Sequence, residues 1–301
     1  MGVVETHSRE APGTNGTIED ERPRLLRLKS LLDEWELDAA AAHLAYTTNA
    51  PRGPITNLKG LDRELGGALA PGLHVVHASP GVGKTAFCLQ VAATSPFPAL
   101  YLTCEMAPLE LFRRQTARVT STYLGRLKSG EFDPAYSVGL ARQAAAAAPK
   151  LAFGDATHAW APPDWLQKAA VAVKGDASHI LIVVDSVHSW AEAAPTDVDE
   201  YTALNDGLAA LRRIARNLIC PVLAIAERNR AKMSAGGLDA SAGSRRFEYG
   251  AESVLALNRE KDEGADGEAK VTLTIEKNRN GAAGKRLPLL FNGALQRFTE
   301  P

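Results

Sequence analysis

The sequence predicts an α/β fold in which a mainly parallel sheet is flanked by helices and preceded by a short N-terminal helical linker. The first observation is that short apolar segments alternate with helical patterns along most of the 301 residues. The second is a glycine-rich loop between the first apolar segment and the helix that follows it. The third is the composition, 45% hydrophobic and 23% charged, which suits one large α/β domain with a short appendage.

The expected elements follow one another in regular alternation. Parallel strands need a crossover connection, so this alternation predicts helices on both faces of the sheet. Strands are expected at 72–76, 98–105, 151–153, 179–185, 220–226, 254–257, 271–276 and 287–291, and helices at 86–92, 108–123, 133–148, 162–173 and 201–217.

The N-terminal part of the chain is predicted to form a tail and a linker. Residues 1–22 are polar and are expected to be disordered, 23–50 to form a helical linker, and 51–301 to form the main domain. Apolar residues recur in the linker at spacings of three and four: Leu25, Leu28, Leu32 and Trp35. Such a stripe packs either on the chain's own domain or on a neighbouring subunit, and the pattern does not choose between them.

The charge balance and the cysteines limit the cellular setting. The net charge is −1 at pH 7, so no overall field attracts nucleic acid or membranes, and any such contact must be local. The three cysteines, Cys88, Cys104 and Cys220, lie in or beside apolar segments without metal-ligand spacing. The start lacks an apolar signal core, and the apolar segments are too short to span a bilayer. We therefore expect a cytoplasmic protein without membrane contact.

The segment HASPGVGKT, 77–85, has the pattern of a phosphate-binding loop between a strand and a helix. Gly81 and Gly83 allow backbone N–H groups to converge on a phosphate, and the helix N-terminus adds a partial positive charge. Lys84 can reach the β- and γ-phosphates, and the Thr85 hydroxyl can bind Mg²⁺. The alternative is a glycine-containing turn with an incidental Lys-Thr pair. The residues expected to contact the nucleotide begin with alanine where the usual G-x-x-x-x-G-K-[ST] pattern has glycine: Ala78, Ser79, Pro80, Gly81, Val82, Gly83, Lys84, Thr85 and Ala86.

Two carboxylates are expected near this loop. Asp185 ends the apolar segment 179–185, as in a Walker B strand whose carboxylate holds the hydration shell of Mg²⁺. A strand that merely ends in Asp is the alternative. Glu105 ends the segment 98–105 and can orient or deprotonate the water that attacks the γ-phosphate. On position alone, it equally fits a residue that stabilises the dipole of the next helix.

A further pattern lies just after the second expected strand and combines an acid, leucines and arginines: Cys104, Glu105, Met106, Leu109, Leu111, Arg113 and Arg114. Together with the alanine that begins the phosphate loop and the segments 61–72 and 276–298, it resembles the DnaB-type replicative helicases, a branch of the RecA-like ATPases. The resemblance covers about 55–298, which is most of the chain.

The resemblance implies a RecA-like P-loop NTPase that binds ATP and Mg²⁺. It implies a homo-oligomer, expected to be a hexameric ring, with single-stranded DNA as a partner. Glu105 would be the catalytic carboxylate, acting with Lys84. Lys277 and Arg279 would reach the nucleotide of the neighbouring subunit and stabilise charge on the transferring phosphoryl group. Without the resemblance, Lys277 and Arg279 would be interpreted as an exposed cationic face.

Two positions depart from the pattern of the family. His188 stands where the family usually has Gln after the Walker B strand, and Glu227 replaces the Gln thought to sense the γ-phosphate. A carboxylate near phosphate is repelled unless Arg228 or Mg²⁺ compensates its charge. These departures support nucleotide hydrolysis more than strand unwinding.

One basic segment is the candidate for contact with DNA. A stretch rich in Gly, Ala and Ser, 234–244, could form a mobile loop that grips the backbone of a single strand from inside a ring. A solvated surface loop is the alternative. The flanking cations are Arg228, Arg230, Lys232, Arg245 and Arg246.

The leading hypothesis is an ATP-dependent DnaB-like DNA helicase, or a translocating ATPase on single-stranded DNA, that hydrolyses ATP at the subunit interfaces of an oligomeric ring. The alternative is a RecA/KaiC-like regulatory or recombination ATPase without unwinding activity. The two altered Gln positions and the near-neutral charge point toward this alternative.

Overall fold

The computed structural model describes residues 25–227, 250–263 and 268–301. The chain divides into two compact units, Met1–Ala50 and Pro51–Pro301. The disordered tail expected at 1–22 lies outside the described residues. No helix in the described ranges is both long and apolar enough to cross a membrane.

The described part of the first unit is helical. A short 3₁₀ helix, η1 (Leu28–Leu31), leads into α1 (Leu32–Thr48), and Asn49 caps α1 in the left-handed conformation. No residue of either helix is buried. Leu25 precedes both helices and Leu28 lies in η1, so the apolar stripe expected along 25–35 does not belong to one continuous α-helix.

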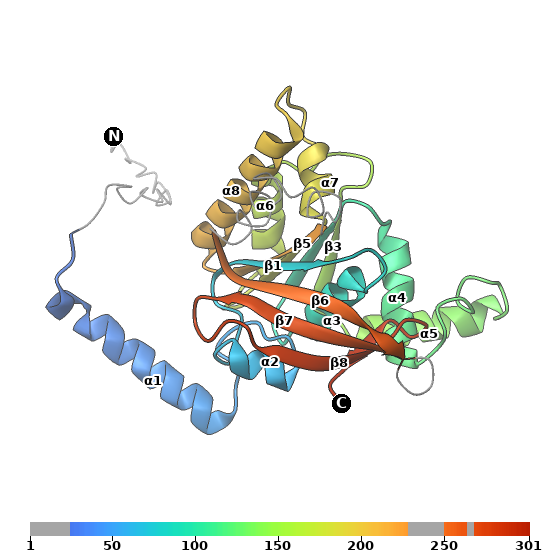
Figure 1. Ribbon diagram of the computed structural model, residues 1–301, viewed down its shortest axis with the longest axis horizontal. Helices are drawn as coiled ribbons and strands as arrows, with labels where there is room; N and C mark the ends of the chain where they lie inside the picture. The colour runs from blue at the N-terminus through green and yellow to red at the C-terminus, as the bar shows by residue number, and fades with distance from the viewer. Residues whose placement is uncertain (1–24, 228–249, 264–267) are drawn as a thin grey trace, which may run out of the picture. The chain divides into compact units, whose positions relative to one another are not determined.

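The second unit is built on a sheet of nine strands within the described residues (Figure 1). Its order is β3-β2-β4-β5-β1-β6-β7-β8-β9. The strands from β3 to β6 in this order pair in parallel, and β7, β8 and β9 extend the sheet in antiparallel fashion. The bounds of the strands are β1 (Gly72–Ala78), β2 (Ala99–Thr103), β3 (Leu151–Asp155), β4 (Leu181–Asp185), β5 (Pro221–Glu227), β6 (Ala251–Glu263), β7 (Ala269–Asn278), β8 (Arg286–Asn292) and β9 (Arg297–Thr299).

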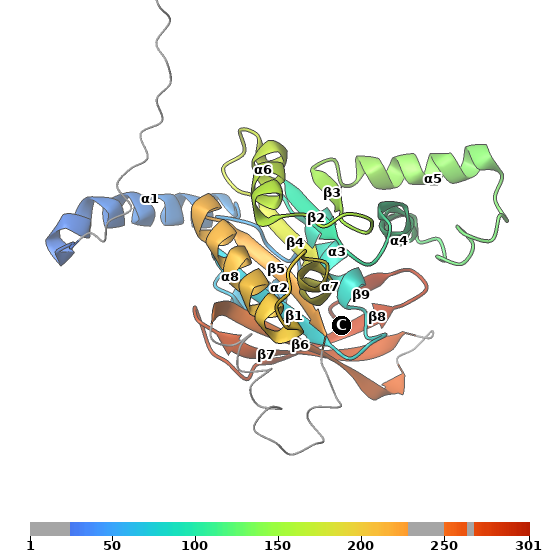
Figure 2. The same ribbon diagram turned by 90° about the horizontal axis from the view of Figure 1, so that it is seen from above.

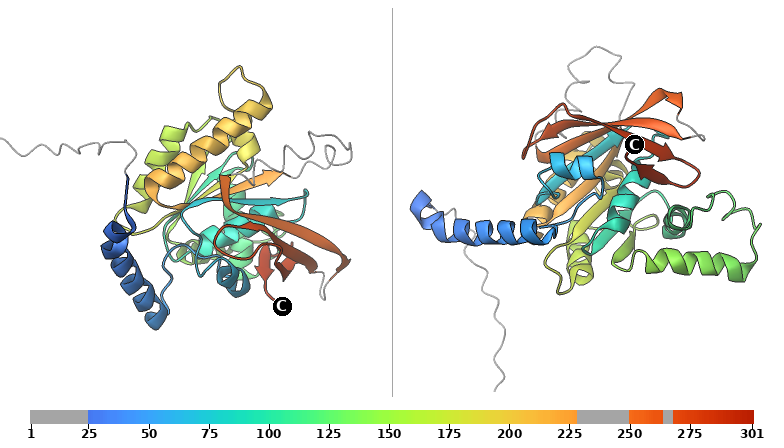
Figure 3. Two further views of the ribbon diagram at one scale, coloured as in Figure 1. Left: turned by 60° about the vertical axis from the view of Figure 1, so that its left-hand side comes forward. Right: turned by 90° about the horizontal axis from the view of Figure 1, so that it is seen from below.

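Helices cover both faces of this sheet because successive side chains of each buried strand enter opposite layers. In β1, Val76 and Ala78 pack in one core with α3 and α4, whereas Leu73 and Val75 pack in another with α6, α7 and α8. Figure 2 shows α6 and α8 together beside the sheet, and Figure 3 shows the red C-terminal strands extending it at one edge. The bounds of the helices are α2 (Lys59–Glu64), α3 (Lys84–Thr94), α4 (Pro108–Thr120), α5 (Pro134–Ala146), α6 (Pro163–Lys174), α7 (Val187–Glu192) and α8 (Glu200–Leu218).

The predicted fold class, a mainly parallel sheet flanked by helices, is confirmed. The element bounds differ at several places. β6 and β7 are longer than expected because they pair with each other as a long antiparallel ribbon. The helices α2 and α7 have only six residues each, which is too short for a periodic pattern to reveal them.

The buried side chain of His74 makes the stability of the fold depend on pH. The ring of His74, on β1, accepts a hydrogen bond at Nδ1 from Ser253 Oγ at 2.8 Å and donates one from Nε2 to the Ala70 carbonyl, also at 2.8 Å. Burial lowers the pKa of His74 from 6.5 to about 4, against the hydrogen bond to Ala70, which raises it. The folded protein therefore keeps this ring neutral at a pH where the unfolded chain binds a proton.

We expect the free energy of unfolding to fall with acid partly through His74. Its contribution is complete above pH 6.5 and is lost as the pH falls toward 4, at about 1 kcal/mol per pH unit, because the unfolded state then binds more protons. Urea unfolding between pH 4 and 7 of the wild type and of His74→Gln measures this slope. The variant should lose stability less steeply, and equal slopes would contradict the assignment.

Candidate active site

The glycine-rich loop connects the end of β1 at Ala78 to the start of α3 at Lys84. Gly81 and Gly83 adopt left-handed φ values of +80° and +106°, for different reasons. Apart from its two chain neighbours, no described residue has an atom within 4 Å of a Cβ added to Gly81, whereas one added to Gly83 would meet the rings of two aromatic residues at 3.0 Å. The loop is therefore open toward one side and closely supported from the other.

The support beneath the loop comes from the C-terminal strands. Phe291 of β8 and Phe298 of β9 stack with their ring centres 4.4 Å apart, directly against Gly83. Gln90 of α3 holds Phe298 through both amide atoms: Nε2 donates to the Phe298 carbonyl and Oε1 accepts from the Phe298 N–H, each at 2.9 Å. Strands distant in sequence thus fix the start of α3. Sequence reasoning found these phenylalanines only through the resemblance.

No side chain caps the N-terminus of α3, because its N-cap residue is Gly83. The first N–H groups of a helix have no partner within the helix, so here they are available to an anion. The ammonium group of Lys84 donates to the Ala78 carbonyl at 3.1 Å, which holds it across the loop. This arrangement suits the binding of a phosphate group.

The first acidic group of the site is Asp185 at the end of β4. Its Oδ2 accepts a hydrogen bond of 2.6 Å from the hydroxyl of Tyr101 on β2, and both side chains are buried. Burial raises the pKa of Asp185, while hydrogen bonds from Tyr101 and Thr85 lower it. Thr85 and Asp185, the pair expected to bind Mg²⁺, therefore lie in contact. Sequence reasoning missed Tyr101.

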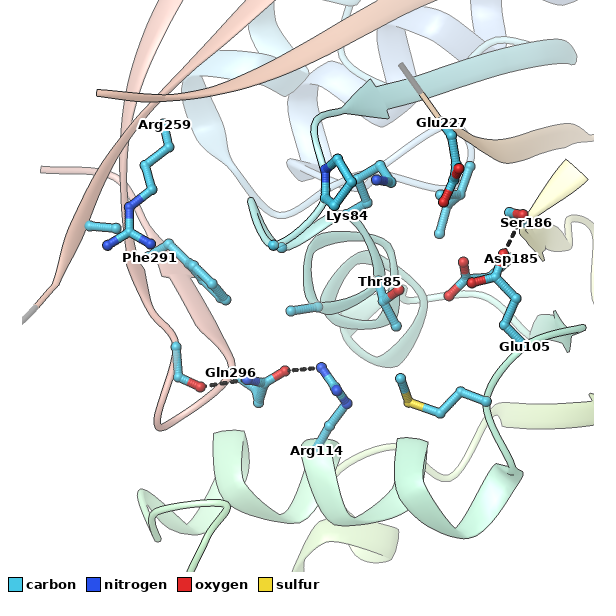
Figure 4. A pocket seen from close by; sticks show the side chains of 18 of the residues that line it. Lys84, Thr85, Glu105, Arg114, Asp185, Ser186, Glu227, Arg259, Phe291 and Gln296 are labelled. Carbon is cyan, nitrogen blue, oxygen red and sulfur yellow. Dashed lines mark hydrogen bonds between the residues drawn. The ribbon is translucent and has the colours of Figure 1, made fainter. Parts of the chain in front are cut away.

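The second acidic group, Glu105, is held by serines that follow β4. Its Oε1 accepts from Ser186 Oγ at 2.5 Å (Figure 4) and from Ser189 Oγ at 2.6 Å. The N–H of Cys104 also donates to the Asp185 carbonyl at 2.8 Å, which ties the ends of β2 and β4 together. The carboxylate thus points toward α7. It does not lie in the first turn of α4, where the acidic residue is Glu110.

The loop and the acids face one cavity of about 540 Å³, here called the loop cavity (Figure 4). It is lined by residues from three places in the chain. Lys84 and Thr85 begin α3, Asp185 ends β4, and Glu105 follows the end of β2. These ends are neighbours because β1, β4 and β2 run in the same direction. Parallel sheets commonly bind ligands at this edge.

The far wall of the loop cavity contains residues to which sequence reasoning gave no role. Arg114 of α4 donates from Nη1 to Gln296 Oε1 at 2.6 Å, and Gln296 Nε2 donates to the Gly293 carbonyl (Figure 4). Arg259 of β6 and the ring of Phe291 complete this wall. Two guanidinium groups, an amide and an aromatic ring thus face the loop across a space large enough for a nucleotide. Arg114 appeared only as part of the family pattern, and no sequence signal indicates Arg259 or Gln296.

The two departures from the family pattern lie next to each other. Glu227, at the end of β5, lines the loop cavity. Its N–H donates to His188 Nδ1 at 3.4 Å. Burial lowers the pKa of His188, and the nearby carboxylate of Glu227 partly offsets this shift. Glu227 therefore brings a carboxylate to the loop cavity, and its backbone N–H contacts the imidazole of His188.

Lys277 and Arg279 are not among the described residues that line the loop cavity. Arg279 follows β7 and lies in a second cavity of about 650 Å³, and Lys277 is near the end of β7. The cations proposed for DNA fall in residues 228–249, outside the described part of the chain: Arg228, Arg230, Lys232, Arg245 and Arg246.

The sequence of this chain is similar to those of curated replicative DNA helicases. The replicative DNA helicase DnaB of Haemophilus influenzae is 25% identical over 264 residues, which are 82% of this chain and 55% of that protein. The chain thus spans about half the length of the curated relatives it matches.

Solved structures show the same fold. A DnaB-like replicative helicase, solved in a study of its interactions with primase, matches with a TM-score of 0.72 and 17% identity, covering 91% of this chain and 67% of that one. A KaiC-like protein, PH0186 from Pyrococcus horikoshii, matches with a TM-score of 0.56 and 17% identity. The match covers 83% of this chain and 99% of that one. These likenesses confirm the RecA-like fold.

The family comparison covers nearly all of the second unit. The model of the DnaB-like helicase C terminal domain matches residues 53–300. This chain therefore belongs to the family of DnaB-like helicase C-terminal domains.

Proposed function

We propose that this protein is the ATP-hydrolysing motor of a DnaB-like DNA helicase, working in the cytoplasm as a homo-oligomeric ring of six subunits. The observation that carries the proposal is the convergence of Lys84, Thr85, Asp185 and Glu105 on one cavity beside a helix N-terminus. These are the groups that phosphoryl transfer requires: a cradle for phosphates, ligands for a metal ion and an acid that directs water.

Each residue of the loop cavity has a role in this proposal. The backbone of 78–86 and the ammonium of Lys84 bind the β- and γ-phosphates. Thr85 and Asp185 hold Mg²⁺, which when bound neutralises charge on the phosphate oxygens. Glu105 orients the attacking water and accepts its proton, while Ser186 and Ser189 keep the carboxylate in place.

The far wall of the loop cavity is proposed to hold the base and ribose. The guanidinium of Arg114 donates to Gln296; its buried Nε lies 3.9 Å from Glu110 Oε1 but makes no hydrogen bond with the described residues. A buried donor without a partner costs free energy, so a ligand that supplies an acceptor there gains affinity.

The position of Arg279 supports a site shared between subunits. Arg279 lies in the same cavity as Gly72, the first residue of β1. The phosphate loop begins at the other end of this strand, at its last residue, Ala78. Seven residues of strand separate the two ends by about 20 Å, which is farther than a side chain extends. Lys277 and Arg279 are therefore proposed to act on the nucleotide of a neighbouring subunit.

Single-stranded DNA is the proposed track of the motor. The support for this partner is the family and the basic composition of 228–246, which suits a salt-sensitive grip on a phosphate backbone. A regulatory or recombination ATPase without unwinding activity is the second candidate. It is favoured by Glu227, which places a carboxylate in the loop cavity where the family has Gln.

We expect ATP hydrolysis by the assembled protein to increase several-fold when single-stranded DNA is added. A motor couples turnover to movement along its track, whereas a regulatory switch has no reason to respond. Steady-state phosphate release with and without a long oligonucleotide measures this, at low and high salt because the contact is ionic. Light scattering of the same samples gives the assembly mass. Hydrolysis without stimulation would favour the second candidate.

A further inference from the structure

The second cavity, here called the arginine cavity, lies where β1 and β6 begin and β7 ends. Its volume is about 650 Å³, and Arg212 and Arg216 of α8 line it together with Arg279. A single carboxylate among the described lining residues, Glu252 of β6, lies with these three cations. Nothing in the proposed chemistry of the loop cavity accounts for Glu252.

Glu252 holds Arg279 at two points. The Oε1 of Glu252 accepts from Arg279 Nη1 at 2.8 Å, and its backbone carbonyl accepts from the Arg279 N–H, also at 2.8 Å. The side chain of Glu252 is only 16% exposed, whereas that of Arg279 is 56% exposed. One residue thus fixes both the backbone and the guanidinium of an arginine that otherwise faces outward.

Glu252 is itself fixed by the start of β1. A Cβ on Gly72 would collide with Glu252 Cγ, and the φ of +138° at Gly72 is one that other residues rarely adopt. The turn beneath Arg279 is also fastened, since Asn278 Nδ2 donates to the Glu64 carbonyl at 2.7 Å. The carboxylate therefore has a defined place from which to orient the guanidinium.

From this geometry we infer that Glu252 is a positioning residue for Arg279, orienting its guanidinium toward the nucleotide of the neighbouring subunit. The inference rests on the proposed function of Arg279. A guanidinium has five N–H donors, and the ion pair uses Nη1, which leaves donors on the other nitrogens for phosphate oxygens. Because the Arg279 side chain is 56% exposed, solvent screens its half of the ion pair, and we expect the pair to act mainly on the orientation of the guanidinium.

The test is steady-state ATP hydrolysis by the full chain carrying Glu252→Gln, which keeps the size of the side chain and removes its charge. We expect kcat to fall about 10- to 100-fold, as for a misplaced catalytic group, with KM and nucleotide affinity unchanged. The thermal midpoint and the assembly mass should stay at wild-type values. Glu131→Gln is the matched control, because it breaks an Arg–Glu pair of 2.7 Å elsewhere and should leave kcat unchanged.

Mixed assemblies separate positioning from a structural effect. Glu252→Gln subunits keep an intact loop cavity and lose the orientation of Arg279, whereas Glu105→Gln subunits do the reverse. Mixing them creates interfaces in which both parts are intact, so the mixture should exceed the mean activity of the two separate proteins. A defect confined to the folding of its own subunit gives no such gain and would overturn the inference.

Arg279→Ala distinguishes this inference from the proposal beneath it. If Arg279→Ala loses about 10³-fold in kcat and Glu252→Gln loses nothing, the positioning role is wrong and the shared site stands. If Arg279→Ala keeps full kcat, the shared site itself is wrong. If Glu252→Gln lowers the thermal midpoint, raises KM and lowers kcat by a similar factor, Glu252 has a structural role alone.

Discussion

Replacing Glu105 by Gln will lower the turnover of ATP by about 10³-fold while the nucleotide still binds. The amide keeps the shape of the carboxylate and can still meet Ser186 and Ser189, but it cannot take a proton from water. General-base catalysis contributes roughly 10²- to 10⁴-fold, so the loss lies in that range. Single-turnover phosphate release gives the rate, and equilibrium binding of a fluorescent ATP analogue gives the affinity.

Glu192→Gln is the control for this experiment. Glu192 is exposed on α7, the helix that also carries Ser189, and it does not line the loop cavity. Its replacement should leave both the rate and the affinity at the wild-type level. Full turnover in Glu105→Gln would show that another group directs the water.

Replacing Lys84 by Ala will weaken ATP binding by about 100-fold and abolish hydrolysis. The ammonium lies at the start of α3, and a charge-assisted contact with phosphate is worth about 1.5 to 3 kcal/mol. The variant also loses the bond from Lys84 to the Ala78 carbonyl, which holds the loop. Isothermal titration with a non-hydrolysable analogue in the presence of Mg²⁺ measures the affinity.

Lys168→Ala, on α6, is the matched control for charge. It changes the net charge by the same amount without touching the loop cavity, so its affinity should equal that of the wild type. Unchanged affinity in Lys84→Ala would mean that the nucleotide binds elsewhere.

The parts of the site that could be predicted from sequence are formed by residues that are close to one another in the chain or stand at the end of a recognisable strand. The loop, its lysine and its threonine form one local pattern, because a strand, a turn with left-handed glycines and a helix follow one another directly. Asp185 and Glu105 could be placed because each stands at or just after the end of an apolar strand, and parallel strands end at the same edge.

The parts that could not be predicted depend on which strands become neighbours. Tyr101 reaches Asp185 only because β2 pairs with β4, with Thr103 opposite Asp185. Arg259 reaches the loop cavity only because β6 pairs with β1, and Gln296 only because β7, β8 and β9 extend the sheet in antiparallel fashion. Hydrophobic patterns identify strands, but they do not give their order or direction.

The contact between Gly83 and the two stacked phenylalanines has a consequence for biosynthesis. The phosphate loop emerges from the ribosome before Phe291 and Phe298, which belong to β8 and β9. A nascent chain therefore carries the complete binding motif long before it has the aromatic floor that shapes it. We therefore expect ATP to stabilise the folded state through this site only once β9 has joined the sheet.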